Sequence, residues 1–210
     1  MGTFFLEGPT GQLECLYGKP KEGLTVKGVL IMLPPHPQKG GTNQNKVVQT
    51  VLKAASSKNY FTYAPNFRGV GRSEGQYDHG QGERADVLAL IEVVKNRHSN
   101  LPLILAGFSF GAYIALHVAQ SQLCSHLILL SLAVGIYKIP APLIPAGVAT
   151  LLIHGGEDEV IPLEKVLSWA KEQNTPLIVL PAATHFLHRQ LMVLQRLIKQ
   201  FLPCLLYTSP

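Results

Sequence analysis

Short apolar runs alternate with amphipathic stretches along most of the chain. Each apolar run ends near glycine or proline, as is typical of buried parallel strands, whereas apolar residues spaced three and four apart mark one face of a helix. The alternation predicts an α/β fold with right-handed crossovers, in which a mostly parallel sheet is covered by helices on both faces. We expect strands within residues 4–17 (two strands joined by a turn at 8–11), 26–33, 60–67, 102–106, 126–133, 150–154 and 177–180.

The amphipathic stretches between these strands predict the covering helices. The stripe made by Leu187, Leu191, Leu194, Ile198 and Phe201 predicts a final helix, which Pro203 stops. Further helices are expected on the stripes Val47/Val51/Ala55, Val87/Leu90/Ile91/Val94 and Leu163/Val166/Leu167/Ala170, and over residues 112–122.

A glycine-rich loop spans residues 68–82, ahead of the second predicted helix. We expect its glycines to let the loop fold back, while Glu83 and Asp86 cap the helix that follows. Asp78, His79 and Glu83 could instead touch a substrate, but we assign none of them a catalytic role.

The loops that follow strands are the candidate sites, because ligands of such sheets bind beyond the carboxyl ends of the strands. The most informative of these loops is the pentapeptide Gly107-Phe108-Ser109-Phe110-Gly111, between a predicted strand and a predicted helix. A serine at so sharp a turn has a strained backbone, and glycines two residues away on either side relieve the crowding. The hydroxyl then projects above the sheet as a nucleophile, at the N-terminus of the helix. The alternative is that Ser109 only caps that helix.

A serine hydroxyl becomes a useful nucleophile only when a base takes its proton, and histidine is the residue type suited to that task near neutral pH. The loop after the last strand offers His185 and, three residues later, His188. We favour His185 as the base, because His188 is expected to lie already in the final helix and to point along its surface.

A carboxylate behind the imidazole fixes its tautomer and stabilises the imidazolium. The loop after strand 150–154 offers Glu157, Asp158 and Glu159. We favour Asp158, because a short carboxylate at that point turns inward before the apolar pair Val160-Ile161 re-enters the core. The neighbouring glutamates are expected to be solvated.

An oxyanion that develops on the substrate also needs hydrogen-bond donors. The first expected donor is the backbone N–H of Phe110, directly after the nucleophile. The second should come from the loop after strand 26–33, where prolines 34, 35 and 37 carry no N–H. His36 is therefore the expected second donor, with Gln38 as the alternative; otherwise the prolines only stiffen a turn.

Composition narrows the function further. The chain has 210 residues, of which 47% are hydrophobic and 15% charged, which suits one folded domain over residues 1–210. The net charge of +5 is scattered without a basic run, so no nucleic-acid partner is expected. No apolar stretch reaches membrane-spanning length and no secretory signal is visible, so we expect no membrane partner.

The three cysteines, Cys15, Cys124 and Cys204, lie far apart and are odd in number. They predict neither a disulfide framework nor a metal site, and they favour a cytoplasmic location. The remaining histidines lack the spacing to cysteine or acid that zinc requires and are expected to be structural or at the surface. They are His79, His98, His117, His126 and His154.

With these residues in place, the chain resembles the α/β-hydrolase superfamily over about residues 26–191. More narrowly, it resembles the small, lid-less, dienelactone-hydrolase-like serine hydrolases of bacteria. The resemblance implies a three-layer α/β-hydrolase fold with an eight-stranded sheet, Ser109, Asp158 and His185 as the catalytic triad, and hydrolysis of carboxylic esters without cofactor or metal. The most specific shared motifs are Pro35-His36-Pro37, Gly40-Gly41-Thr42, Asn45-Lys46-Val47-Val48, residues 66–71, residues 107–113 and Thr184-His185-Phe186.

The segment at 134–149 bears on the substrate. Lid domains of this superfamily are usually inserted there, but about sixteen residues are too few for a helical cap. We therefore expect no cap domain, an open and shallow site, and a small ester with a short or flexible acyl group as substrate.

Other functions would use the same residues. A thioesterase, a small peptidase or a perhydrolase side activity would need the same machinery, and a non-catalytic protein could bind a ligand or partner in the same cleft. The apolar tail at 201–207 could pack against a second subunit, so monomer and homodimer both stay open.

Overall fold

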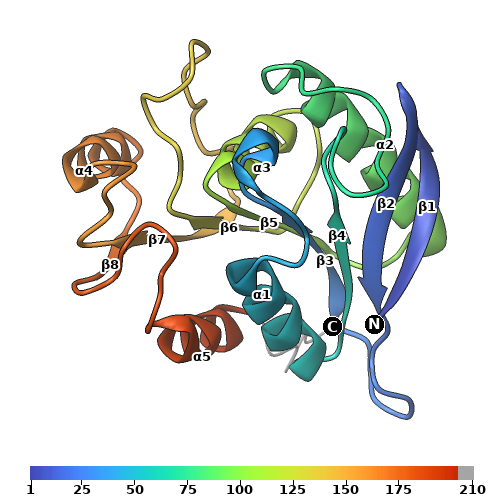
Figure 1. Cartoon of the computed structure of the whole chain (residues 1–210). Coiled ribbons are helices and arrows are strands. Elements are labelled where there is room, and N and C mark those ends of the chain that lie inside the picture. Colours follow the sequence, from blue (N-terminus) through green and yellow to red (C-terminus); the bar gives the residue numbers. More distant parts are fainter. Residues whose placement is uncertain (203–210) are drawn as a thin grey trace.

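The computed structural model describes residues 1–202, and within them an eight-stranded sheet lies between two layers of helices (Figure 1). The strand order is β1-β2-β4-β3-β5-β6-β7-β8. β2 runs antiparallel to β1 and β4, and all other neighbours are parallel. This confirms the predicted three-layer fold with a mostly parallel sheet. The strands are β1 (Gly2–Gly8), β2 (Gly11–Gly18), β3 (Gly28–Leu33), β4 (Tyr60–Pro65), β5 (Leu103–Phe108), β6 (His126–Leu130), β7 (Ala149–Gly155) and β8 (Leu177–Leu180).

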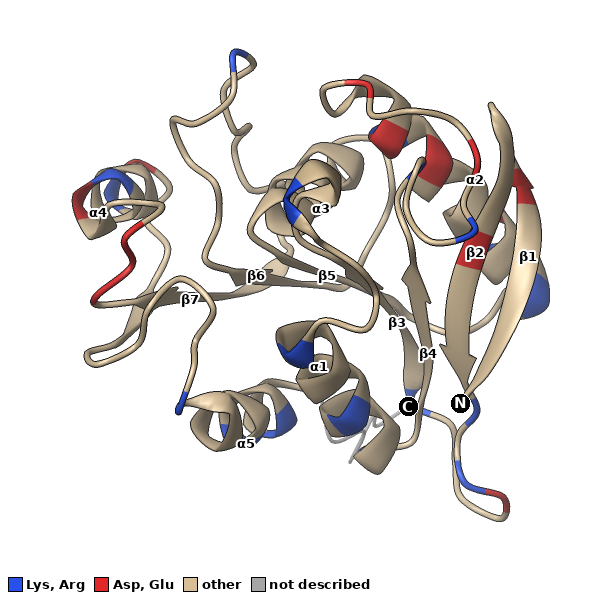
Figure 2. Ribbon diagram, viewed as in Figure 1, with Lys and Arg blue, Asp and Glu red and all other residues tan. Residues whose placement is uncertain are grey.

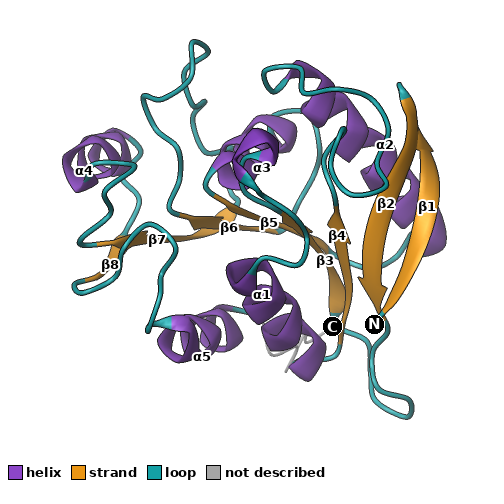
Figure 3. Ribbon diagram, viewed as in Figure 1, coloured by secondary structure: helices purple, strands orange, loops and turns teal. Residues whose placement is uncertain are grey.

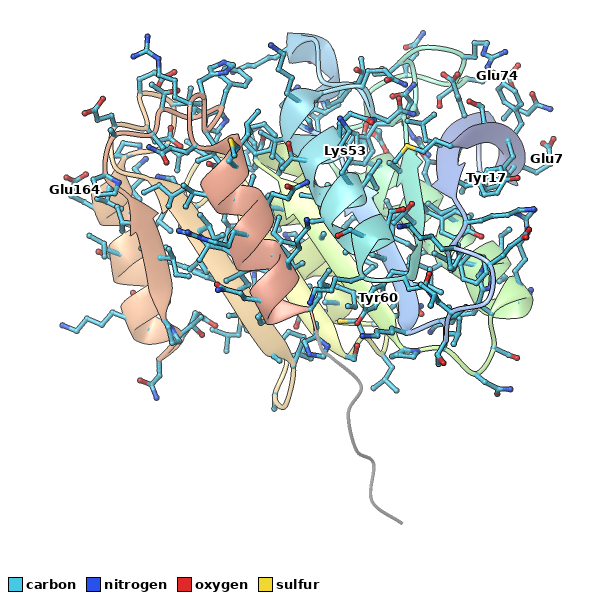
Figure 4. The ribbon with its side chains drawn as sticks, turned by 90° about the horizontal axis from the view of Figure 1, so that it is seen from below. Glu7, Tyr17, Lys53, Tyr60, Glu74 and Glu164 are labelled. Carbon is cyan, nitrogen blue, oxygen red and sulfur yellow. The ribbon has the colours of Figure 1, made fainter. Side chains whose placement is uncertain are left out.

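Helices cover both faces of the sheet (Figure 3). On one face, α1 and α5 pack against each other across the strands, as the view from below shows (Figure 4). On the other face lie α2, α3 and α4, with the larger of the two cores beneath them. The helices are α1 (Lys46–Ser57), α2 (Gln81–Arg97), α3 (Phe110–Ala119), α4 (Leu163–Glu172) and α5 (Leu191–Phe201), with a 3-10 turn η1 (Pro37–Lys39).

The central strands are apolar throughout because both of their faces are covered. In β3, for example, Val29 and Ile31 face the core under α2 and α3, whereas Leu30 and Met32 face α1 and α5. All six residues of this strand are buried. A strand covered on both faces is expected to be a continuous apolar run in the sequence. This is why the apolar run at 26–33 predicts β3.

The predicted start of the final helix is wrong. α5 begins at Leu191, and Leu187 lies in a turn with a positive φ of 52°. The N–H of Leu187 donates to the carbonyl oxygen of Thr184 within that turn. Leu187 is nevertheless fully buried, so its apolar character reflects burial rather than helical spacing. His188 is consequently an exposed turn residue and not part of the helix.

The predicted caps of α2 are half correct. Both carboxylate oxygens of Glu83 accept backbone N–H groups, from Asp78 at 2.9 Å and from Gly80 at 2.8 Å. Asp86 does not cap the helix. It binds the buried guanidinium of Arg68 through two hydrogen bonds of 2.6 and 2.7 Å, and so ties the glycine-rich loop to α2.

Lys, Arg, Asp and Glu residues are distributed over several helices, strands and loops (Figure 2). Within residues 1–202, no helix has both the length and the apolar character needed to cross a bilayer. Cys15 and Cys124 are free and buried. Cys204 and positions 203–207 of the apolar tail lie outside the described residues.

Candidate active site

The turn between β5 and α3 holds Ser109 in a strained conformation. Its φ of 55° and ψ of −114° lie outside the regions that L-residues ordinarily adopt. A Cβ atom added at Gly107 would collide with the backbone of Gly111, and one added at Gly111 would collide with the carbonyl groups of Leu33 and residue 34. Both flanking glycines are therefore required for the approach of β5, α3 and the end of β3, as the pentapeptide predicts.

Loops from the ends of β5, β7 and β8 bring three polar side chains together. Nε2 of His185 lies 3.0 Å from Oγ of Ser109, and Nδ1 of His185 lies 2.8 Å from Oδ2 of Asp158. All three side chains are buried. The hydrogen bonds of the imidazole ring go to Asp158 and Ser109 rather than to Glu157 or Glu159, and both glutamates are exposed. The three side chains therefore meet in space, as the sequence analysis expects. Their catalytic roles stay a prediction.

Asp158 is held as a carboxylate by its surroundings. Its Oδ1 accepts the N–H groups of Val160 at 2.9 Å and Ile161 at 2.8 Å. Burial alone would raise the pKa of Asp158, but the hydrogen bonds from His185 and from these two N–H groups outweigh it and lower the pKa below its usual value. A carboxylate at Oδ2 can only accept, so Nδ1 of His185 carries the proton and Nε2 is free to accept the Ser109 hydroxyl proton.

Two backbone N–H groups are available for an oxyanion. Phe110 is the first residue of α3, and its N–H has no acceptor among the hydrogen bonds of the described residues. The same holds for the N–H of His36. The alternative donor, Gln38, is already engaged, because its N–H donates to Nδ1 of His36 at 3.2 Å. This arrangement favours His36 over Gln38, and its role at the oxyanion stays a prediction.

Ser109 and His185 line a pocket of about 130 Å³. Pro35, Gly41, Tyr137 and Ile161 also line it. Tyr137 belongs to the segment at 134–149, which is a loop without helix or strand until β7 begins at its last residue. This segment lines the pocket but carries no helical cap.

Comparisons with known proteins identify the superfamily of this chain. Residues 38–149 match the family model described as serine aminopeptidase, S33. An uncharacterized protein of Rickettsia prowazekii (strain Madrid E) is 31% identical over 170 residues, which cover 79% of this chain and 71% of that protein. This chain belongs to the α/β-hydrolase superfamily. The family-model match over more than half of the chain places it there, together with solved structures of α/β serine hydrolases that are more than 30% identical.

Solved structures show which kind of α/β hydrolase this chain is similar to. An α/β serine hydrolase homologue from Coxiella burnetii is 36% identical, with a TM-score of 0.88 over 96% of this chain and 97% of that chain. A lid-less α/β serine hydrolase from Xanthomonas campestris is 32% identical, with a TM-score of 0.90 over 100% of this chain and 96% of that chain. The likeness to a lid-less enzyme fits the short 134–149 segment and the predicted absence of a cap domain.

The structure of the hydrolase also reveals supporting residues that the sequence did not single out. The N–H of His185 donates to the Glu159 carboxylate at 3.2 Å, and its carbonyl oxygen accepts the Ser131 hydroxyl at 3.2 Å. Ser131 is fully buried at the end of β6 with a positive φ of 45°. A hydroxyl at the end of an otherwise apolar run was the available signal. Glu159, considered as the acid, instead anchors the backbone of His185.

The remaining histidines of the hydrolase differ in their burial and in their hydrogen-bond partners. His98 and His126 are partly buried away from the site, with hydrogen bonds to Tyr63 and Ser125. His154 is fully buried beside Asp158. Among residues 1–202, no group of three or more His, Cys, Asp or Glu side chains could hold a metal ion.

Proposed function

We propose that this α/β hydrolase cleaves carboxylic esters of short acyl groups through an acyl-enzyme intermediate. The continuous hydrogen-bond chain from Asp158 through His185 to Ser109 carries the proposal. Nucleophile, base and orienting acid are the three parts that acyl transfer requires. Here they stand at hydrogen-bond distances from one another, and Ser109 and His185 line one pocket.

The reaction proceeds in two halves. Oγ of Ser109 attacks the ester carbonyl carbon while Nε2 of His185 takes the hydroxyl proton, and the carbonyl electrons move to oxygen. When the carbon–oxygen bond to the leaving group breaks, His185 gives the proton to the departing alcohol. A water then repeats the sequence on the acyl-Ser109 ester, releasing the carboxylic acid and restoring the hydroxyl. Asp158 stabilises the imidazolium in both halves.

The N–H groups of Phe110 and His36 would bind the negative oxygen of each tetrahedral intermediate. Such donors contribute more in the transition state than in the ground state, because charge develops on that oxygen only as the bond forms. Phe110 lies at the start of α3, so the positive end of the helix dipole adds to the same point.

The size of the pocket supports short acyl groups. Its volume of about 130 Å³ is well below the range of about 300–1,000 Å³ that drug-sized ligands occupy. A long alkyl chain would extend past the pocket into water, where its methylene groups gain no binding free energy.

The name of the matching family model raises aminopeptidase activity as a second candidate. An aminopeptidase must bind the free ammonium group of its substrate, and a carboxylate would serve that purpose. Among the described residues, the pocket lining includes Lys39 but no Asp or Glu. The charge of the lining therefore favours an ester without a cationic group next to the scissile carbonyl.

Hydrolysis of a p-nitrophenyl ester series tests the proposed function. We expect p-nitrophenyl acetate and butyrate to be cleaved with higher kcat/KM than the palmitate, and S109A to abolish turnover. S125A is the matched control, because Ser125 is a partly buried serine whose hydroxyl bonds to Leu103 at the opposite end of the sheet. Faster cleavage of the palmitate, or of an aminoacyl p-nitroanilide, would contradict the substrate class, and undiminished turnover by S109A would contradict the mechanism.

A further inference from the structure

His154 is a fully buried histidine that the proposed mechanism leaves unused. It lies near the carboxyl end of β7, four residues before Asp158. Its Nε2 atom is 2.9 Å from the carbonyl oxygen of Ile161 and 3.5 Å from Oδ2 of Asp158. The imidazole ring of His154 therefore lies between β7 and the loop that carries Asp158 and Ile161.

The contacts of His154 determine where its proton lies. A carbonyl oxygen can only accept, so Nε2 is the donor to Ile161. Nδ1 is buried and has no hydrogen-bond partner among the described residues. Burial lowers the pKa of His154 in spite of the opposing effect of the Ile161 carbonyl and the Asp158 carboxylate. The ring is thus neutral at pH 7, with a single N–H directed at the loop.

Two side chains pin the peptide groups of Ile161 from opposite directions. Its N–H donates to Oδ1 of Asp158, and its carbonyl oxygen accepts from Nε2 of His154. Ile161 is itself fully buried, so the anchor point is fixed in the core. With Oδ1 occupied by backbone N–H groups, Oδ2 is the oxygen left to face Nδ1 of His185.

We propose that His154 is a positioning residue for the acid: its Nε2–H holds the Ile161 carbonyl and thereby keeps Oδ2 of Asp158 on Nδ1 of His185. The inference rests on the proposed function, because it gives His154 a part in the same proton transfer. Loss of the N–H leaves a buried carbonyl without its donor, which frees the loop to shift. A displacement of the acid of about 1 Å would weaken the orientation of the base.

A pair of substitutions separates the hydrogen bond from the packing. H154Q can place an amide N–H where the imidazole Nε2–H stood, whereas H154L keeps the apolar volume without a donor. With p-nitrophenyl acetate, we expect H154L to lower kcat about tenfold while KM changes less than about twofold, and H154Q to retain most of kcat. The strongly downfield proton NMR signal of the His185–Asp158 hydrogen bond should weaken or move upfield in H154L and persist in H154Q.

H98L is the matched control for general destabilisation. His98 is partly buried, stacks on Phe61 and bonds to the Tyr63 hydroxyl at 2.8 Å, away from the site. We expect H98L to lower the Tm without changing kcat or the downfield signal. If H154L does not fold, H154N serves instead, because its shorter amide cannot reach Ile161.

The outcomes distinguish the two proposals. Wild-type kcat and an unchanged downfield signal in folded H154L, with normal labelling of Ser109 by a fluorophosphonate, would overturn the role of His154 and leave the proposed function standing. Equal loss of kcat in H154L and H154Q would also overturn it, since the donor would then be irrelevant. Wild-type protein that neither labels nor turns over an ester would remove the proposed function, and the role of His154 with it.

Discussion

The proton on His185 is placed by the atoms on either side of the ring. Asp158 accepts the N–H at Nδ1, so the lone pair of Nε2 faces the Ser109 hydroxyl at 3.0 Å. An amide at position 158 could donate to Nδ1 and reverse the tautomer, which would turn two donors toward each other at Ser109. The identity of the acid therefore matters as much as its distance.

His117 shows how burial of another histidine should make stability depend on pH. It packs on Tyr113, and its Nε2 is buried without a partner among the described residues. Burial, followed by the charge of Arg84, lowers the pKa of His117 to about 4. In the unfolded chain the pKa of histidine is about 6.5, so the unfolded chain binds the proton first as the pH falls. The folded state therefore loses stability between about pH 6.5 and 4.

The measurement is urea unfolding of wild-type protein and H117F at pH 7 and pH 5. We expect the free energy of unfolding to fall by about 1 kcal/mol less in H117F than in the wild type, a figure already reduced for the partial exposure of the ring. Burial also lowers the pKa of His98 and His126, so both proteins should still lose some stability. Equal pH dependence in the two proteins would contradict the assignment.

The sequence identifies residues whose chemistry is distinctive, and it fails for those whose role depends on packing. Ser109 and His185 stand out by their neighbours in the chain and by their positions after strands. The sequence marks Ser131 only by its hydroxyl after an apolar run, and it does not show that Ser131 and His154 bond to the backbone groups of His185 and Ile161, which folding brings beside them. Chain order cannot reveal a contact between residues 131 and 185.

The turn from β5 to α3 is the element on which the candidate site depends most. Gly107 and Gly111 approach other backbone segments so closely that a methyl group at either position would require the backbone to move. The strained backbone of Ser109 is held by its surroundings: its N–H donates to the carbonyl oxygen of Leu130, and Gly111 lies directly against the end of β3.

G111A should therefore destabilise the fold by about 3 kcal/mol or more, since it forces β3 and α3 apart. The control is G23A, in an exposed loop where a new Cβ meets no atom within 4 Å. Gly23 has a φ of 77°, so this control should cost only about 1–2 kcal/mol of backbone strain. Equal losses of unfolding free energy in the two variants would show that the predicted crowding is absent.

Element types were predictable from periodicity, but several boundaries were not: β6 ends at Leu130 rather than at 133, and α3 spans Phe110–Ala119 rather than 112–122. The stripe of α5 includes Leu187 by spacing, yet that residue turns back through the left-handed region to carry the chain from His185 into the helix. A buried leucine in a turn and a buried leucine in a helix look alike in the sequence. The functional consequence is small, because His185 and not His188 faces Ser109 in the structure.

Across the molecule, the glycine-rich loop is joined to the helical layer by the Arg68–Asp86 ion pair. The side chains are only 6% and 4% exposed, and the contacts are bidentate. By contrast, the Arg72–Glu14 pair leaves Arg72 65% exposed. A buried charge that loses its partner is costly, whereas an exposed one returns to water.

D86N should lower the free energy of unfolding by about 3 kcal/mol, because it leaves the Arg68 cation buried beside a neutral amide. R72Q should change it by less than about 1 kcal/mol. Chemical unfolding of both variants at pH 7 measures the difference. Similar small losses in the two would mean that solvent reaches the Arg68 site and that the loop is held by other contacts.

The reaction of Ser109 with a fluorophosphonate tests the central claim most directly. Intact-mass and peptide mass spectrometry of wild-type protein should show one covalent adduct per chain, located on Ser109. S109A should carry no adduct, and H185Q should label far more slowly because the hydroxyl keeps its proton. An unlabelled wild-type protein, or an adduct that persists in S109A, would contradict the account of Ser109 as a nucleophile activated by His185 and Asp158.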